Sequence, residues 1–187
     1  MKYLFLICFL AIGINGDSQI TVVGGINVSS IRQTNFIFSQ ESASRIGYHV
    51  GVHYKSDLGS SFAFNPAVIY SQKGAGFGAF VPTLDLNYLD FPLMFVYQKY
   101  PDQSFFAEAG PYLGFLVSAY DGVNDVKDSY NSLDMGLGIG AGYDLGRMVL
   151  GGRGMIGLTN IPNLNTGTTQ DTRTTNISGQ LYLGFQL

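Results

Sequence analysis

The side chains best suited to chemistry in this chain are ionisable groups that lie within apolar, alternating segments. Glu108, Asp134 and Arg153 each occupy such a segment, and His49 and His53 share another. Carboxylates, a guanidinium and two imidazoles could form an ion-pair network, an ion path, a ligand site or an acid–base pair. Which of these applies depends on the elements that carry the residues and on where the side chains point.

The elements are β-strands, because apolar residues alternate with small or polar ones through most of the chain. In 133–145 large apolar residues hold most odd positions, whereas Gly or Asp holds every even one. A phase change near Tyr88–Leu89 predicts a β-bulge, and Pro66, Pro92 and Pro111 predict weakened ladders. Eight strands are predicted, over residues 20–28, 46–54, 62–70, 84–97, 105–117, 133–145, 148–158 and 177–187.

The connections between these strands alternate between long and short. The long ones are Ile31–Ser44, Lys73–Thr83, Ala119–Asn131 and Asn160–Thr175, and the short ones are Asp57–Ser60, Tyr100–Gln103 and Asp144–Arg147. Outer-membrane barrels sort their loops in this way. We therefore expect a closed eight-stranded antiparallel up-and-down transmembrane β-barrel, with short periplasmic turns, long extracellular loops and both termini in the periplasm.

Alternation alone does not say which face of the barrel is outside, and a soluble lipocalin-like barrel would bury the apolar face. Only 12% of the residues are charged, about half the usual share of a soluble domain. Glycines at 136, 138, 140 and 142 would make a poor solvated surface but suit a narrow lumen. Six aromatic residues fall beside the short turns and predict an interfacial girdle: Tyr54, Phe62, Tyr97, Phe105, Tyr143 and Phe185.

The N-terminus predicts the compartment. Lys2 precedes the apolar run Tyr3–Ile14, which suits the core of a signal peptide and is too short to span a bilayer. We expect a cleaved signal peptide over residues 1–18 and an outer-membrane barrel domain over 19–187. The expected partners are outer-membrane lipid, the barrel-assembly machinery and an unidentified extracellular ligand at the long loops. A net charge of −3 argues against nucleic acid.

Alternation turns the ionisable groups toward the lumen. Glu108, Asp134 and Arg153 lie on neighbouring predicted strands, so we expect Arg153 to pair with both acids in a structural network that also includes His49 and His53. No catalytic, cofactor or metal site is predicted. The two histidines would lie about 13 Å apart along a strand, too far to share an ion, and the sequence has no Gly-x-Ser-x-Gly elbow.

Several motifs resemble the PorT-like outer-membrane β-barrel family of Bacteroidota. They are GGINVS (Gly24–Ser29), NYLDFPLMFVY (Asn87–Tyr97), AGPYLGFLV (Ala109–Val117), LDMGLGIGAGYDLG (Leu133–Gly146), GLTNI (Gly157–Ile161) and the terminal LYLGFQL. The resemblance implies an eight-stranded barrel in the outer membrane and no particular activity. Asp90 stands where relatives often have Glu, and the chain ends in Leu187 rather than an aromatic residue.

The function expected from the sequence is that of a small outer-membrane barrel with a side-chain-filled lumen. Its role would be structural, adhesive or accessory, without enzymatic activity and without a cofactor. The alternatives are a narrow channel or transporter for small solutes, the accessory barrel of a secretion system, a barrel enzyme built on His49 or His53, and a soluble periplasmic barrel.

Overall fold

The computed structural model describes residues 18–34, 39–76, 83–100, 104–162 and 173–187, and these are mostly β-strand. The predicted signal peptide therefore lies almost wholly outside the described residues. Eight long strands form the fold: β1 (Ser18–Thr34), β3 (Arg45–Asp57), β4 (Phe62–Ala75), β5 (Leu84–Gln98), β6 (Phe105–Asp121), β8 (Leu133–Asp144), β9 (Met148–Gly157) and β10 (Arg173–Gln186).

Three short elements accompany the long strands on the side of the long connections. They are strands β2 (Ser39–Glu41) and β7 (Asn124–Asp125) and the single 3₁₀ turn η1 (Lys127–Ser129). Strand β2 pairs only with β1, and β7 pairs only with β6. Among the described residues, no helix has the length and apolar character needed to cross a bilayer.

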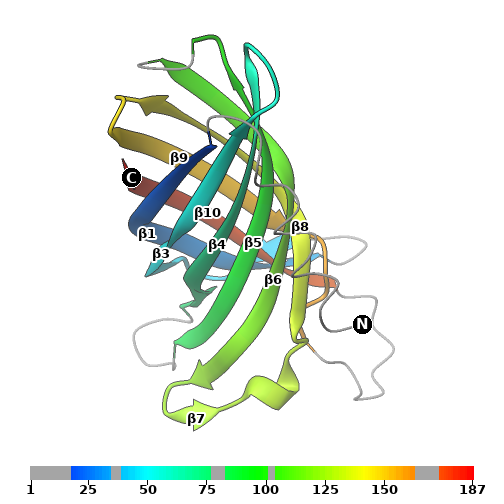
Figure 1. Ribbon diagram of the computed structural model, residues 1–187. Coiled ribbons are helices and arrows are strands. Elements are labelled where there is room, and N and C mark those ends of the chain that lie inside the picture. The colour runs from blue at the N-terminus through cyan, green and yellow to red at the C-terminus, as the bar shows by residue number, and fades with distance from the viewer. Residues whose placement is uncertain (1–17, 35–38, 77–82, 101–103, 163–172) are drawn as a thin grey trace, which may run out of the picture.

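Consecutive long strands pair antiparallel, and the first strand pairs with the last. The register between β1 and β10 runs from Thr21 opposite Gln186 to Thr34 opposite Arg173, which closes the sheet into a barrel (Figure 1). Closure satisfies the backbone groups of both terminal strands, so the wall has no open edge along these strands. The predicted closed eight-stranded antiparallel barrel is thus confirmed.

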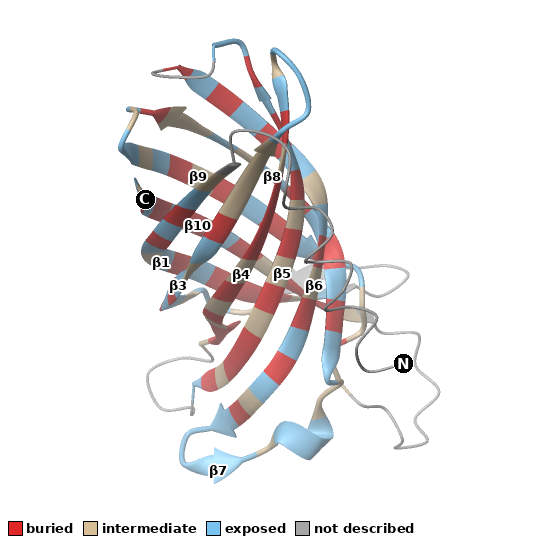
Figure 2. Ribbon diagram, in the orientation of Figure 1, coloured by how far each residue is buried: buried red, intermediate tan, exposed pale blue. Residues whose placement is uncertain are grey.

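The barrel has a polar, buried inner face and an apolar, exposed outer face. Along β8 buried residues, Asp134 among them, alternate with exposed leucine, isoleucine and methionine side chains. Figure 2 shows the same alternation on the other strands. Ile139 is 69% exposed and Leu181 is 61% exposed, which would be unfavourable in water over so large an area. The outer face therefore suits lipid, and the soluble barrel with a buried apolar face is contradicted.

Aromatic side chains ring the outer face beside the short turns, as the sequence predicts. Phe62 and Tyr97 pack with ring centroids 5.3 Å apart, and Phe105 and Tyr143 with centroids 4.8 Å apart. Such rings favour the boundary between lipid and water. The rim with the short turns is therefore one boundary of the apolar band.

Irregularities fall where the sequence predicts them. The register between β5 and β6 shifts between Asn87 and Tyr88, and this bulge turns Asp90 into the lumen, where it is 1% exposed. Each interior proline lacks a register partner on one side, because it has no N–H to donate. Pro66 is unpaired toward β3, Pro92 toward β4 and Pro111 toward β5.

Several strands extend further toward the long connections than the sequence predicts. Strand β1 continues to Thr34, β4 to Ala75 and β6 to Asp121. These extensions are polar and lack the large apolar residues of the lipid-facing band, so the sequence predicts loops there. Lys73 therefore lies in β4 and points into the lumen, where it is buried.

Candidate functional site

Apolar clusters lie in the lumen toward both of its ends. One buried cluster lies at the end with the long connections, and Val126 and Tyr130 pack against it. Its members are Ile31, Ala75, Leu84, Leu86, Tyr88, Leu116, Ala119 and Ile161. At the end with the short turns, Ala63, Val96 and Phe106 form a smaller cluster with Val149 against it. Eight strands leave space for side chains only, and these clusters occupy that space.

Two charged groups lie between the clusters. The one nearer the short turns is the Arg153 layer, which consists of Arg153, Glu108, Tyr182, His49 and His53. Arg153 Nε donates to Glu108 Oε1 at 2.8 Å, and both side chains are almost fully buried. The guanidinium carbon lies 5.6 Å from the centre of the Tyr182 ring. Both imidazoles also meet this ring edge-on, with His53 at 5.6 Å and His49 at 6.5 Å between centroids.

The second charged group is the Lys73 layer, which consists of Lys73, Asp90, Asp134, Tyr112 and Asn176. Lys73 Nζ donates to Asp90 Oδ1 at 2.9 Å and lies 3.8 Å from Asp134 Oδ2. Tyr112 Oη and Asn176 Nδ2 donate to that same Asp134 oxygen, at 3.1 and 3.0 Å. The carboxylate of Asp134 is therefore held by three different strands.

The lysine also contacts aromatic rings. Its Nζ lies 4.8 Å from the centre of the Tyr88 ring and 4.9 Å from the centre of the Tyr112 ring. An ammonium over a ring face is attracted by the ring's quadrupole, more strongly when water is excluded. These contacts fix Lys73 between the two carboxylates.

All five lumen residues named from the sequence are buried inside the barrel. The structure brings Arg153 and Glu108 together, with the two histidines nearby. It does not bring Asp134 to Arg153, because Asp134 belongs to the other layer and contacts Lys73 instead. Whether these layers serve only stability stays a prediction.

Sequence reasoning missed Lys73 and the lumen tyrosines. A signal for Lys73 was present, because Ile69, Ser71 and Lys73 stand in one phase of the same alternation. All three are buried in β4. The alternation places Tyr112 and Tyr182 on the inner face, but it predicts no contacts for them there.

Glycines on the inner face make room for the large lumen side chains. A Cβ at Gly140 would lie 2.7 Å from Glu108 Oε1, and one at Gly114 would lie 2.6 Å from Asp90 Oδ1. Gly151 lies under the Tyr182 ring, which leaves no space for a Cβ there. Close approach of a neighbour is a known reason for glycine within a strand, and here it lets a narrow barrel hold charged and aromatic groups.

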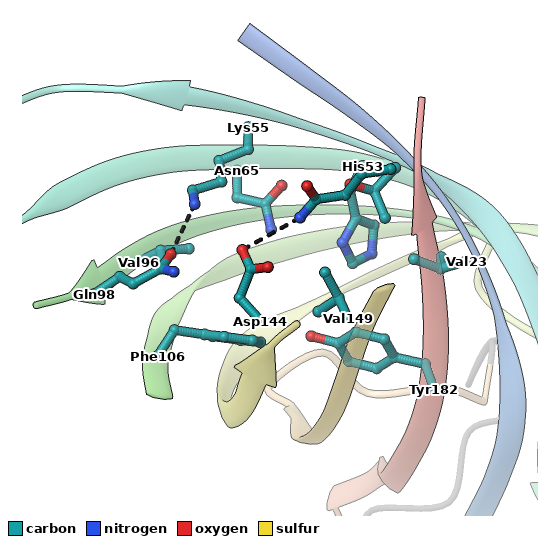
Figure 3. Close-up of a pocket in the computed structure, with 12 residues that line it drawn as sticks. Val23, His53, Lys55, Asn65, Val96, Gln98, Phe106, Asp144, Val149 and Tyr182 are labelled. Atoms are coloured by element: carbon teal, nitrogen blue, oxygen red, sulfur yellow. Dashed lines mark hydrogen bonds between the residues drawn. The ribbon is translucent and has the colours of Figure 1, made fainter. Parts of the chain in front are cut away.

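A small pocket opens at the short-turn end, beside His53 and Asn65 (Figure 3). Lys55 Nζ donates to Gln98 Oε1 at 2.7 Å across its mouth, and Gln186 Nε2 donates to Asp144 Oδ2 at 3.2 Å. The cavity measures about 30 Å³, which admits water but no larger solute. Val23, Val96, Phe106, Val149 and Tyr182 also line it.

The two lumen histidines are the residues on which the alternative of a barrel enzyme depends. His49 Nδ1 and His53 Nε2 have no hydrogen-bond partner, so neither imidazole is oriented by a carboxylate through that atom. Within the described ranges, no three His, Cys, Asp or Glu side chains are grouped so that they could hold a metal ion.

Comparison with known proteins agrees with this architecture. Ail, the attachment invasion locus protein of Yersinia pestis, is 13% identical, with a TM-score of 0.50, and the match covers 93% of this chain and all of Ail. Neisserial surface protein A is 14% identical, with a TM-score of 0.49, over 89% of this chain and 96% of that one. No curated protein sequence matches the chain.

A third solved structure, the outer membrane protein OprG from Pseudomonas aeruginosa, is 11% identical, with a TM-score of 0.47, over 94% of this chain and 98% of that one. At 13% identity the likeness to Ail shows the fold alone. The family model of the outer membrane protein beta-barrel domain matches residues 15–163, which is most of the chain. With its closed eight-stranded wall and apolar exterior, the chain belongs to the outer membrane protein beta-barrel domain family.

Proposed function

We propose that this small outer-membrane barrel is plugged and non-enzymatic, and that it acts through its long loops in a structural, adhesive or accessory role. The filled lumen is the observation that carries the proposal. Apolar clusters lie at both ends, and two buried charged layers lie between them. A barrel closed in this way leaves the loops as the surface on which partners could be recognised.

The proposed orientation places both termini and the short turns in the periplasm and the long loops outside the cell. Loop lengths support it, because outer-membrane barrels have short periplasmic turns. Residues 1–18 would be removed as a signal peptide during export, and the barrel-assembly machinery would insert the rest into outer-membrane lipid. The motifs quoted above support membership of the PorT-like group and a source in Bacteroidota.

The long-loop side offers a surface for an extracellular ligand. A hairpin formed by the end of β6 and by β7 carries Val123 at its tip, where the side chain is 95% exposed. Gly122 in the turn has a φ of 60°, a left-handed conformation that glycine adopts without strain. An apolar side chain held at the tip of an ordered hairpin is available for contact with a partner.

A narrow channel is the second candidate, and one observation favours it. Both terminal nitrogens of Arg153 and Nε2 of His53 are buried without a hydrogen-bond partner, and His53 lines the pocket at the short-turn end. Waters would satisfy these donors and acceptors, and they could enter from that end. The path would then have to cross the Lys73 layer and the apolar cluster beyond it.

Conductance in a planar bilayer separates the two candidates. The purified barrel is expected to give no steady current, because side chains fill its lumen. A steady ohmic current from wild type would contradict the plugged barrel. A current blocked by Gly138→Phe, which adds a ring to the lumen, but not by Ile139→Phe, which faces lipid, would establish the channel.

A further inference from the structure

The buried charges of the lumen do not balance. Among the described side chains, the Arg153 layer pairs one guanidinium with one carboxylate. The Lys73 layer holds one ammonium and two carboxylates, those of Asp90 and Asp134. If every group carries its usual charge, the Lys73 layer has one negative charge in excess.

This excess charge has no access to solvent. Lys73 and Asp90 are each 1% exposed and Asp134 is 2% exposed. The apolar cluster at the long-loop end includes Tyr88, whose ring Lys73 contacts, and the Arg153 layer lies toward the other end. A carboxylate buried without a counterion is strongly disfavoured, and such a group takes up a proton in preference to remaining charged.

The hydrogen bonds of the two carboxylates leave room for a proton. Asp90 Oδ2 and Asp134 Oδ1 are both buried and have no hydrogen-bond partner. The hydrogen bonds described above all go to the other oxygen of each carboxylate, Asp90 Oδ1 and Asp134 Oδ2. Each acid therefore has one oxygen that could carry hydrogen without displacing a donor.

The two acids are close enough to interact. A Cβ placed on Gly114 would lie 2.6 Å from Asp90 Oδ1 and 3.6 Å from Asp134 Cβ, so both side chains lean over the same glycine. Carboxylates in such proximity do not readily ionise together. The ammonium of Lys73 already lies between them, at 2.9 and 3.8 Å, which disfavours a metal cation as the missing charge.

The other charged group that acts on these acids is Arg153, which acts electrostatically on Asp90 but is already paired with Glu108. The remaining groups described around them carry no compensating charge. Ser71 of β4 and Asn27 of β1 hydrogen-bond each other. Tyr88 of β5, Tyr112 of β6 and Asn176 of β10 supply neutral side chains. Arg45, which donates to the backbone oxygen of Lys73, is paired with Asp85.

We propose that the Lys73 layer is a proton-binding site in which Asp90 and Asp134 together hold one proton at neutral pH. The proton comes from bulk water when the barrel folds, and it makes the layer neutral, with one ammonium, one carboxylate and one carboxylic acid. The proton belongs to the coupled pair and not to either residue alone.

Infrared spectroscopy of the full barrel in detergent tests this proposal. At pH 7 wild type is expected to show the C=O stretch of a protonated carboxylic acid, and the band should shift when the protein is made with aspartate labelled by ¹³C at the side-chain carboxyl. This measurement needs no variant. Absence of the band, or a band that aspartate labelling does not shift, would overturn the proposal.

Variants then locate the proton. The band is expected to be lost in both Asp90→Asn and Asp134→Asn, because either change removes the excess charge. It is expected to persist in Asp144→Asn, a buried aspartate at the short-turn pocket. Loss of the band in Asp144→Asn but in neither layer variant would place the proton elsewhere and contradict the proposal.

Discussion

Replacing Arg153 with methionine is expected to lower the free energy of unfolding by about 3–5 kcal/mol, the usual loss when one partner of a buried ion pair is removed. The variant Arg153→Met leaves Glu108, which is 2% exposed, without its cation. It also removes the guanidinium from the Tyr182 ring. Urea-induced unfolding from liposomes, followed by far-UV circular dichroism, measures the loss.

The double variant Arg153→Met with Glu108→Leu separates charge from packing. It is expected to recover much of the lost stability, because no uncompensated charge stays in the lumen. Arg45→Met is the matched control, since Arg45 pairs with a partly exposed Asp85 at the rim. That change should cost less than Arg153→Met, because Asp85 is one-third exposed and can be hydrated when its partner is removed. Equal losses of stability in Arg153→Met and Arg45→Met would contradict the buried ion pair. A loss in the double variant equal to the sum of the losses in Arg153→Met and Glu108→Leu would contradict it as well.

A charge on the outer face is expected to destabilise the barrel in a depth-dependent way. Ile139 is 69% exposed and lies in the middle of β8, opposite Ala109 and Gly154 of the adjacent strands. The variant Ile139→Arg should cost about 2–4 kcal/mol, as expected for arginine at the bilayer midplane. The same unfolding experiment in liposomes provides the measurement.

Leu145→Arg is the control for Ile139→Arg. Leu145 is 53% exposed and lies in the short turn between β8 and β9, at the boundary of the apolar band. Its cost is expected to be about 0–1 kcal/mol, because arginine there reaches water. A loss at Leu145 as large as that at Ile139 would show that β8 does not cross a bilayer at Ile139.

The number of strands, their pairing and their inner and outer faces could be predicted from the sequence. Period-two alternation is a local property of the sequence. Once the outer face is known to be apolar, it predicts that a residue such as Glu108 points into the lumen. The bulge at Asn87 and Tyr88 could be predicted as well, because a phase change is visible in the residues themselves. Its effect on the direction of Asp90 could not, since that depends on where the register shifts.

The partners within the lumen could not be predicted. Which inward residues meet depends on the register between strands and on the tilt of the barrel, and alternation encodes neither. Asp134 therefore seemed an equal partner for Arg153 but contacts Lys73, which comes from β4 across the lumen. Lys73 continues the inward phase of Ile69 and Ser71, but the end of β4 lacks the large apolar outward residues that would extend the predicted strand to it.

The central claim is that the apolar face of the wall lies against lipid and the polar face encloses a filled lumen. A nitroxide spin label at Leu183→Cys on β10, with Cys8 replaced by serine, tests it in a barrel reconstituted into liposomes. Frequent collisions with oxygen and few with a water-soluble nickel chelate are predicted there, whereas a label at Val123→Cys should collide often with the chelate. Frequent chelate collisions at Leu183, or protection from both reagents as in a packed core, would contradict the account.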